Sequence, residues 1–365
     1  METNLNLEKR LEDYCLTPAL AGFEEQMIKK LSVDLKQYAD ELNVDVLGNV
    51  IAKIKGSENS KNSLMVFAHT DSIGMIVKSI SENGFIRMER VGGVPERILA
   101  GTKVNLLVGE KVVNGLVGLI AHHLTPQDEK YQVKPIENCY IDIGATSKAE
   151  VEAAGVKVGT PIVYQPSYMN LLENRVAATS LDDRGGCALL VELAAYLSKN
   201  RAKVDVYIVG TVQEEFNLRG AMVAAQQIQP TAAICIDLVA ASDTPEFSNQ
   251  AVRVGAGPVL GTYTFHGRGT LNGLIPHPKM VELIENAAKS KNLNLQRHAT
   301  VGLLTDNSYV QLVGKGIASV DICWPTRYTH SGVEMSSLKD LNDLGELLIT
   351  AVANFPENEN FTRAV

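Results

Sequence analysis

The sequence predicts an α/β protein in which helices flank a mixed, largely parallel sheet and a small β-barrel interrupts the chain. Short apolar runs rich in β-branched residues, such as 63–68 and 204–210, alternate with segments of helical periodicity. This alternation is the βαβ pattern of a parallel sheet. Between residues 73 and 164 the pattern changes to short strands separated by glycine turns, which indicates an inserted all-β domain.

The main domain is expected to begin in residues 1–72 with two helices and a hairpin. Apolar residues recur at helical spacing in 5–16 and in 23–38. Strands are expected at 44–47 and 50–54, on either side of a Gly-Asn pair that is typical of a turn. A buried strand at 63–68 completes this part of the domain.

The inserted region, residues 73–164, is expected to form the barrel. Two of its strands are predicted at 104–108 and 112–117, and its one short helix is predicted at 147–154. The adjacent histidines His122 and His123 also lie here. We interpret them as loop residues, because neighbouring histidines rarely bind the same ion.

From residue 165 to residue 365 the main domain resumes as alternating helices and strands. The expected helices cover about 182–196, 218–227, 278–290 and 337–355, and the expected strands cover 204–210, 231–236 and 316–324. Four glycines between Gly261 and Gly273 indicate a loop at 261–276. The alternation implies that the residues following each strand collect along one edge of the sheet.

Composition excludes several classes of function. With 34 basic and 42 acidic residues the net charge is −8, and only 5% of residues are aromatic, so we expect no nucleic-acid partner. No apolar run is long enough to span a membrane, and the N-terminus lacks the apolar segment of a signal peptide. Five widely spaced cysteines indicate reduced thiols in a cytoplasmic protein.

Acidic and histidine side chains follow the predicted strands. His69 ends the strand at 63–68, and Asp71 is placed to orient its ring by accepting the second ring N–H. Glu214 and Glu215 follow the strand at 204–210, and one of them can bind a metal while the other moves a proton. Taken singly, these residues could equally form a surface turn and a solvated acidic pair.

Three further candidates complete the set. Asp182 begins a helix, where a capping role is the structural alternative, Asp237 ends the strand at 231–236, and His330 follows the strand at 316–324. Two histidines and three carboxylates are the ligands that a pair of divalent ions requires, and one further carboxylate remains as a general base. Mixed nitrogen and oxygen ligands favour Zn, Co or Mn over Mg or Ca.

Five motifs in this order resemble those of the glutamyl aminopeptidase and tetrahedral aminopeptidase family of dinuclear metallo-aminopeptidases. The resemblance covers nearly the whole chain. The motifs are Ala68-His69-Thr70-Asp71-Ser72-Ile73-Gly74, Ser180-Leu181-Asp182-Asp183-Arg184, Val212-Gln213-Glu214-Glu215, Asp243-Thr244-Pro245 and Pro325-Thr326-Arg327-Tyr328-Thr329-His330-Ser331.

The resemblance implies a role for each candidate residue. His69 and His330 would bind one metal ion each, and Asp182 would bridge the two ions. Asp237 and Glu215 would complete the separate coordination spheres. Glu214 would be the general base, and Asp71 would orient His69. The resemblance also implies a zinc-peptidase type of fold, a barrel that serves oligomerisation, a cis peptide between Asp182 and Asp183, and dimers that assemble into a dodecamer.

The implied function is removal of N-terminal residues from short peptides by a water molecule that two metal ions activate. The alternatives are a related dimetal amidase of the aminoacylase or carboxypeptidase type, a catalytically silent relative, and a glycoside hydrolase. Phe216-Asn217, Glu246 and the segment 261–276 depart from the family pattern near the expected substrate pocket. The preferred N-terminal residue and the native metal therefore stay open.

Overall fold

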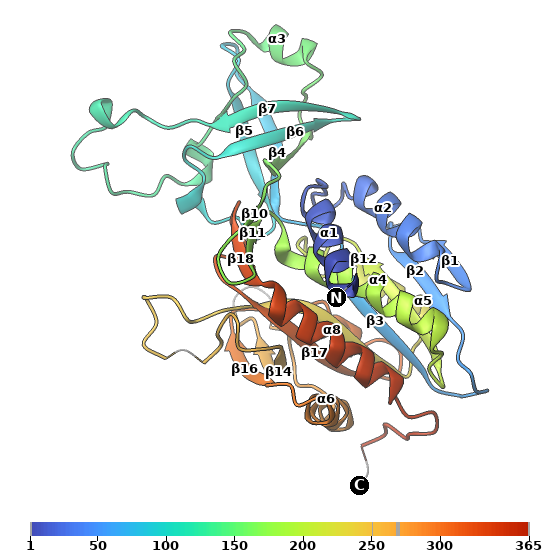
Figure 1. The fold of residues 1–365 in the computed structure, drawn as a ribbon. Helices are drawn as coiled ribbons and strands as arrows, with labels where there is room; N and C mark the ends of the chain where they lie inside the picture. Colours follow the sequence, from blue (N-terminus) through green and yellow to red (C-terminus); the bar gives the residue numbers. More distant parts are fainter. Residues whose placement is uncertain (1, 250, 268–270, 364–365) are drawn as a thin grey trace.

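A nine-stranded mixed sheet forms the centre of the main domain in the computed structural model, which describes residues 2–249, 251–267 and 271–363 (Figure 1). The strand order is β1-β2-β12-β3-β13-β17-β14-β15, and β16 pairs with β14. The strands are β1 Glu41–Val44, β2 Val50–Ile54, β3 Ser63–His69, β12 Asp205–Thr211, β13 Ala232–Ala240, β14 Val259–Phe265, β15 Gly273–Leu274, β16 Gln296–Val301 and β17 Ala318–Thr326.

The four central strands β12, β3, β13 and β17 are parallel to one another, whereas β2 runs antiparallel to β12 and β14 runs antiparallel to β17. Nearly every residue of β3, β13 and β17 is buried. Strands covered on both faces read as continuous apolar runs, which is why these segments could be recognised in the sequence. The predicted α/β class with a largely parallel sheet is therefore confirmed.

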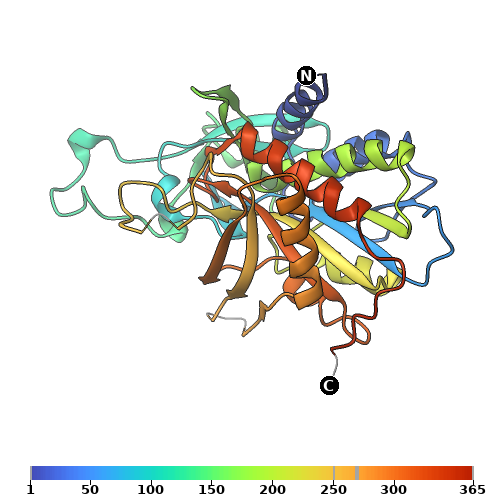
Figure 2. The same cartoon turned by 60° about the horizontal axis from the view of Figure 1, so that its bottom comes forward.

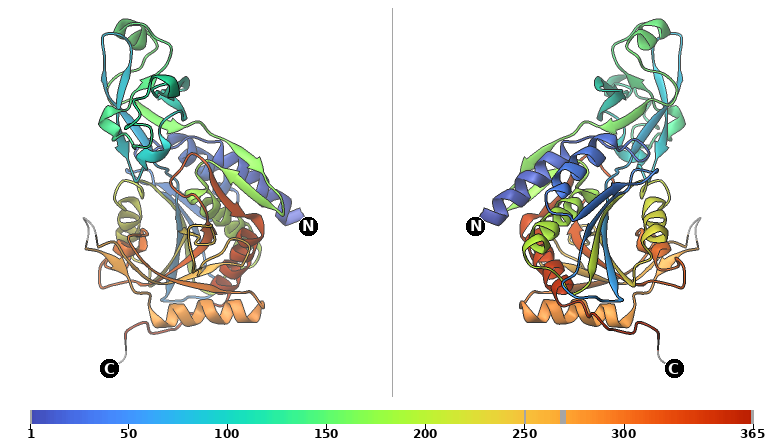
Figure 3. Two further views of the ribbon diagram at one scale, coloured as in Figure 1. Left: turned by 90° about the vertical axis from the view of Figure 1, so that its left-hand side faces the viewer. Right: turned by 90° about the vertical axis from the view of Figure 1, so that its right-hand side faces the viewer.

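Helices cover both faces of this sheet (Figures 2 and 3). One face carries α1, α2, α4, α6 and α8, whose apolar residues share one core with β3 residues Leu64 and Val66. The other face carries α5 and α7, which pack on the alternate β3 residues Met65 and Phe67. The helices are α1 Glu2–Cys15, α2 Glu25–Lys36, α4 Leu181–Lys199, α5 Gly220–Ile228, α6 Pro278–Ser290, α7 Asn307–Val310 and α8 Leu338–Ala353.

A closed barrel of six antiparallel strands lies at the opposite end of the molecule from α6 (Figure 3). Its order is β4-β5-β8-β7-β6-β9, and it has its own apolar core. Its strands are β4 Gly74–Ile80, β5 Ile86–Val91, β6 Lys103–Val108, β7 Lys111–Val117, β8 Ile141–Asp142 and β9 Pro161–Tyr164. The short helix α3 (Lys148–Ala153) begins after Ser147, whose hydroxyl accepts the Glu150 N–H. The predicted insertion of a small barrel is confirmed.

A small three-stranded sheet joins the strand before α4 to the strand before α8. Its order is β10 (Tyr168–Asn170), β11 (Arg175–Ala178) and β18 (Glu334–Ser337), and both pairings are antiparallel. These strands were not predicted, because they are short and two of them follow turn residues. No helix among the described residues is long and apolar enough to cross a bilayer.

The interpretation of residues 261–276 as a loop was wrong in part. β14 continues to Phe265 and pairs with β16 along one edge, and β15 returns at Gly273. Residues 268–270 of that segment lie outside the described residues. Glycines hid these strands, because a glycine in a strand lowers its apparent propensity and only pairing with neighbours reveals it.

Candidate metal centre

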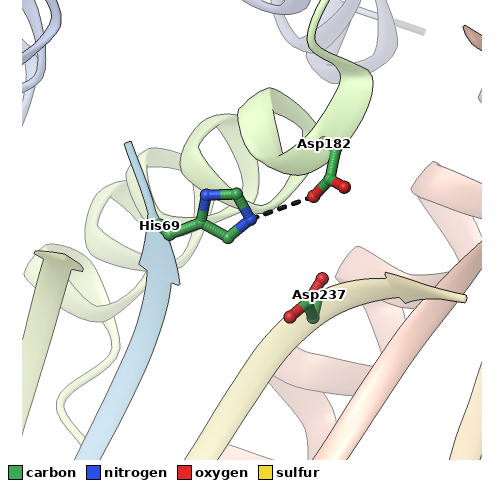
Figure 4. Close-up of side chains that lie close together, drawn as sticks. All are labelled: His69, Asp182 and Asp237. Carbon is green, nitrogen blue, oxygen red and sulfur yellow. Dashed lines mark hydrogen bonds and ion pairs between the residues drawn. The ribbon is translucent and has the colours of Figure 1, made fainter. Parts of the chain in front are cut away.

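Three parallel strands bring candidate residues to one point on the sheet edge, from the last residue of β3, from inside β13 and from the loop after β12. His69 is the last residue of β3 and pairs with Thr211, the last residue of β12. Glu214 and Glu215 come just after that point, and β13 brings Asp237 to the other side of β3. Figure 4 shows His69, Asp182 and Asp237 pointing toward one another from β3, α4 and β13. This convergence is the predicted consequence of parallel strand order.

Asp182 lies at the centre of the site and is only 7% exposed. Its Oδ1 is 2.9 Å from His69 Nε2, and its Oδ2 is 3.5 Å from His330 Nε2. The backbone here is irregular: Ser180 has a positive φ of 59°, and the peptide bond between Asp182 and Asp183 is cis, as the family resemblance implied. The two carboxylate oxygens of Asp182 therefore face two different histidines.

Two groups of possible ligands share this one carboxylate. Ligand atoms of His69, Asp182 and Asp237 all lie within 4.8 Å of one another, and so do those of Asp182, Glu215 and His330. Each group contains one imidazole and two carboxylates, and Asp182 belongs to both. This donor set fits two divalent cations with one bridging carboxylate, because Zn-type ions take nitrogen and oxygen ligands at such spacing.

Glu214 faces the same cavity as the five possible ligands but belongs to neither group. The cavity has a volume of about 530 Å³, and the five possible ligands line it together with Glu214. Phe216, Asn217 and Leu218 form part of its wall, next to the guanidinium of Arg219 stacked on the Phe216 ring at 4.5 Å. Phe216-Asn217, one of the stretches that depart from the family pattern, is thus part of the cavity wall.

Asp71 holds both glutamates through their backbones. Its Oδ1 and Oδ2 accept the N–H groups of Glu214 and Glu215 at 3.0 and 2.9 Å. Its carboxylate is 3.6 Å from His69 Nδ1, whereas its own carbonyl oxygen is closer, at 3.2 Å. The contact to His69 therefore comes mainly from the Asp71 backbone, and the carboxylate is directed to the loop after β12.

The charges of the site are poorly balanced without a cation. Burial raises the pKa of Glu215 to about 7, although His330 opposes the shift. Burial also raises the pKa of Glu214 and of Asp237 well above their usual values. Burial lowers the pKa of His330, but the carboxylates of Glu215 and Asp182 outweigh it and raise that pKa to about 10. Crowded buried carboxylates of this kind are what a divalent cation stabilises.

Residues 48–347 match the family described as M42 glutamyl aminopeptidase. The chain belongs to the M42 glutamyl aminopeptidase family. This family consists of metallopeptidases, so the predicted resemblance and the predicted hydrolase class of this M42 protein are confirmed. Among its relatives is the lysyl aminopeptidase of Pyrococcus furiosus, which is 34% identical over 331 residues and is covered to 91%, with 90% of this chain matched.

Solved structures agree with this assignment. The aminopeptidase APDkam598 from Desulfurococcus kamchatkensis superposes on this M42 protein with a TM-score of 0.90 and 33% identity, over 96% of this chain and 95% of that one. The TET1 peptidase of Pyrococcus horikoshii superposes with a TM-score of 0.84 and 28% identity, over 96% of this chain and all of that one. That peptidase can assemble into a tetrahedron or a large octahedral shell.

Two residues that contact the predicted ligands of this M42 protein were not predicted as part of the site. The carbonyl oxygen of Gly93, in the barrel insertion, accepts a hydrogen bond from His330 Nδ1 at 3.1 Å. Glu334, in β18, accepts the backbone N–H groups of Asp182 and His330. Neither follows a strand of the central sheet, so strand-end position could not identify them. The sequence signals that could have identified them are the Gly-Gly pair at 92–93 and the acidic residue four positions after His330.

Proposed function

We propose that this chain is a two-metal aminopeptidase that removes single residues from the N-termini of short peptides. The observation that supports it most strongly is the shared carboxylate of Asp182, which faces a histidine on each side. His69 and Asp237 would hold one ion, His330 and Glu215 the other, and Asp182 both. Zn, Co or Mn suits these ligands. When bound, the ions would act as Lewis acids and lower the pKa of a water molecule.

Glu214 is proposed as the general base. Its carboxylate lines the cavity without belonging to either ligand group, and Asp71 fixes its backbone. In the proposed reaction water attacks the first peptide carbonyl, forming a C–O bond while the C–N bond breaks. Glu214 takes the proton from the water and delivers it to the nitrogen of the departing peptide.

The cavity suits a free N-terminus. Its volume of about 530 Å³ is in the range of small-molecule sites, and one of the proposed ions would hold the free α-amine of the substrate. A blocked N-terminus has no amine to offer to the ion. The requirement for a free amine thus separates the proposed aminopeptidase from an aminoacylase, which acts on blocked amino acids, and from a carboxypeptidase.

The proposal is tested with a panel of chromogenic aminoacyl amides. The protein is stripped of metal with a chelator and assayed with Zn²⁺, Co²⁺ or Mn²⁺ added back. We expect hydrolysis of free aminoacyl amides that depends on the added ion, with no hydrolysis of N-acetylated amides, of peptides at the C-terminus or of soluble cellulose. Hydrolysis of N-acetylated amides, or of cellulose in the presence of chelator, would contradict the proposal.

We also propose that the chain forms dimers that assemble into a dodecamer, with the barrel of residues 73–164 as the oligomerisation domain and 1–72 with 165–365 as the peptidase domain. A solved structure of the related PhTET1 is a dodecamer, and this supports the proposed assembly. Light scattering coupled to size exclusion should give a mass near twelve times the 39.5 kDa chain, with the dimer as the smaller species. A monomer at every concentration would contradict it.

A further inference from the structure

We propose that Glu334 is a positioning residue for the metal centre, which holds the Asp182 and His330 segments in a fixed relation to each other. The inference rests on the proposed two-metal site. Glu334 lies in β18, which pairs with β11 so that Glu334 is opposite Ala178, four residues before Asp182. It also lies four residues after His330. It is therefore located between the two chain segments that carry these ligands.

Both carboxylate oxygens of Glu334 are used by these segments. Oε2 accepts the backbone N–H of Asp182 at 3.0 Å. Oε1 accepts the backbone N–H of His330 at 2.9 Å and the hydroxyl of Thr329 at 3.3 Å. One side chain thus connects residues that are 148 positions apart in the chain. Because its oxygens face N–H donors, Glu334 positions the backbone of two ligand residues and is not itself a metal ligand.

Burial makes these contacts strong. Glu334 is 2% exposed, so its carboxylate has few water partners and depends on the three protein donors. Hydrogen bonds of 2.9 to 3.3 Å satisfy both buried oxygens of Glu334. A rearrangement of either segment would leave a buried polar atom without a partner, which costs its full desolvation penalty, and this resists movement of Asp182 relative to His330.

The two segments need such support because their backbones are irregular. Ser180, Tyr328 and His330 all have φ near +60°, a region that non-glycine residues rarely occupy. Residues in this region persist where the surrounding contacts hold them. The Glu334 hydrogen bonds fall on Asp182 and His330 themselves, at the positions where the chain must place a ligand atom to within tenths of an ångström.

Asp71 makes the same arrangement on the other side of the site, where it accepts the N–H groups of Glu214 and Glu215. Four of the six residues that line the proposed centre are thus held by one of two buried carboxylates, each through backbone N–H groups. The repetition favours a role in positioning for Glu334 over a role in general packing.

The test is a titration of metal-free full-length protein with Co²⁺ alone, followed by calorimetry and by visible absorption of the bound ion. Glu334→Gln keeps the size of the side chain, but its amide has one acceptor oxygen and turns an NH₂ group toward the other N–H donors. We expect about 10- to 100-fold weaker Co²⁺ binding and an altered absorption band. Glu334→Asp, which keeps the charge on a shorter side chain, should give a smaller loss.

Asp340→Asn is the matched control. Asp340 is also fully buried and also accepts two backbone N–H groups, but those belong to Gly255 and Gly257, away from the ligands. This variant should lose thermal stability and keep wild-type Co²⁺ affinity. Equal losses of affinity in Glu334→Gln and Asp340→Asn would overturn the inference.

The outcomes also separate this inference from the proposed function. Two Co²⁺ ions bound by wild type, with undiminished affinity in Glu334→Gln, would overturn the role of Glu334 and leave the two-metal site standing. Failure of wild type to bind Co²⁺ would overturn both. If Glu334→Gln does not fold, the same Co²⁺ titration is made with Glu334→Asp. Wild-type Co²⁺ affinity and a wild-type absorption band in Glu334→Asp would overturn the inference.

Discussion

Glu214 and Glu215 are adjacent in sequence but have different surroundings. Glu215 Oε1 lies 3.6 Å from His330 Nε2, within one group of possible ligands, whereas Glu214 belongs to neither group. Both are fixed by Asp71 through their backbone N–H groups. A backbone that is neither helix nor strand turns neighbouring side chains in different directions, and this allows the two acids to have separate roles.

Replacing Glu214 by Gln should abolish most of the activity and leave metal binding intact. The amide cannot take a proton from water, and general-base catalysis contributes about 10²- to 10⁴-fold to the rate. We expect kcat on an aminoacyl amide to fall by that factor while two Co²⁺ ions still bind. Glu282→Gln, at an exposed position of α6, is the control and should keep wild-type kcat. Near-normal turnover in Glu214→Gln would remove Glu214 from this role.

A second residue-scale prediction concerns pH and the pair formed by Asp243 and Arg327. Two hydrogen bonds, 2.7 and 2.6 Å long, join the guanidinium to the carboxylate. Burial raises the pKa of Asp243, but Arg327 and the Val254 N–H outweigh it, so the pKa lies below its usual 3.8. Because the folded state favours the charged form, the pair stabilises the fold above pH 4 and loses this contribution as the pH falls through the depressed pKa.

Asp243→Asn should therefore destabilise the protein by about 1–3 kcal/mol at pH 7, and the difference from wild type should shrink as the pH falls toward 3. Unfolding midpoints measured at pH 7, 5 and 3 check this. Glu89→Gln, which removes the exposed partner of Lys78, is the control and should change stability by less than about 1 kcal/mol. A difference for Asp243→Asn that stays constant with pH would contradict the argument.

At the scale of elements, the turn after β5 connects the barrel to the metal centre. Gly93 contacts His330 through its carbonyl oxygen, and a Cβ on Gly93 would lie 2.6 Å from His330 Nδ1. Gly92 has a positive φ of 84°, and a Cβ there would meet Ile73 at 2.7 Å. Glycine at both positions allows the barrel backbone to approach the histidine closely.

Gly93→Ala should displace His330 and weaken one of the two bound ions. We expect about a 10-fold or greater loss of Co²⁺ affinity at one site, because partners that orient a ligand histidine contribute that much. Calorimetric titration of the metal-free protein measures it. Gly144→Ala, in the barrel where a Cβ has no neighbour within 4 Å, is the control and should keep both affinities. Unchanged binding in Gly93→Ala would exclude the barrel turn from the site.

Some elements could be located in the sequence and others could not. The buried strands β3, β13 and β17 and the helices α6 and α8 were found because their apolar patterns are local. β14 was missed because a glycine interrupts its apolar run. β16 was missed because most of its positions are exposed or half-buried and give no apolar pattern. Their strand conformation depends on hydrogen bonds to each other across some 40 residues.

At the scale of the whole molecule, the proposed ions should stabilise the fold. The site gathers four carboxylates in a buried space, and their mutual repulsion opposes folding when no cation is present. An ion that binds only the folded state contributes about 2.7 kcal/mol at one hundred times its dissociation constant. We therefore expect the thermal midpoint to fall in chelator and to rise again when Zn²⁺ or Co²⁺ is restored.

Scanning calorimetry at one fixed protein concentration measures this, because an oligomer has a concentration-dependent midpoint. Asp182→Asn is the control: it lacks the shared carboxylate, so added Zn²⁺ or Co²⁺ should raise its midpoint much less than that of wild type. The same midpoint for wild type with and without metal would contradict the expected linkage between binding and folding.

Local sequence determined which chemical groups this protein offers and where along the chain they fall. His69, Glu214, Glu215, Asp237 and His330 could be picked out because each follows an apolar strand, and a strand signal is contained in a few consecutive residues. Their meeting could be anticipated from parallel strand order. The family motifs added the expected role of each residue.

Only the tertiary structure decided what holds these groups in place. Gly93 reaches His330 across 237 positions, and Glu334 reaches Asp182 across 152. Contacts between segments so far apart depend on the docking of the barrel and of β18 against the main sheet, and no periodicity in the chain encodes them. The supporting carboxylates and the close glycine therefore became visible only once the chain was folded.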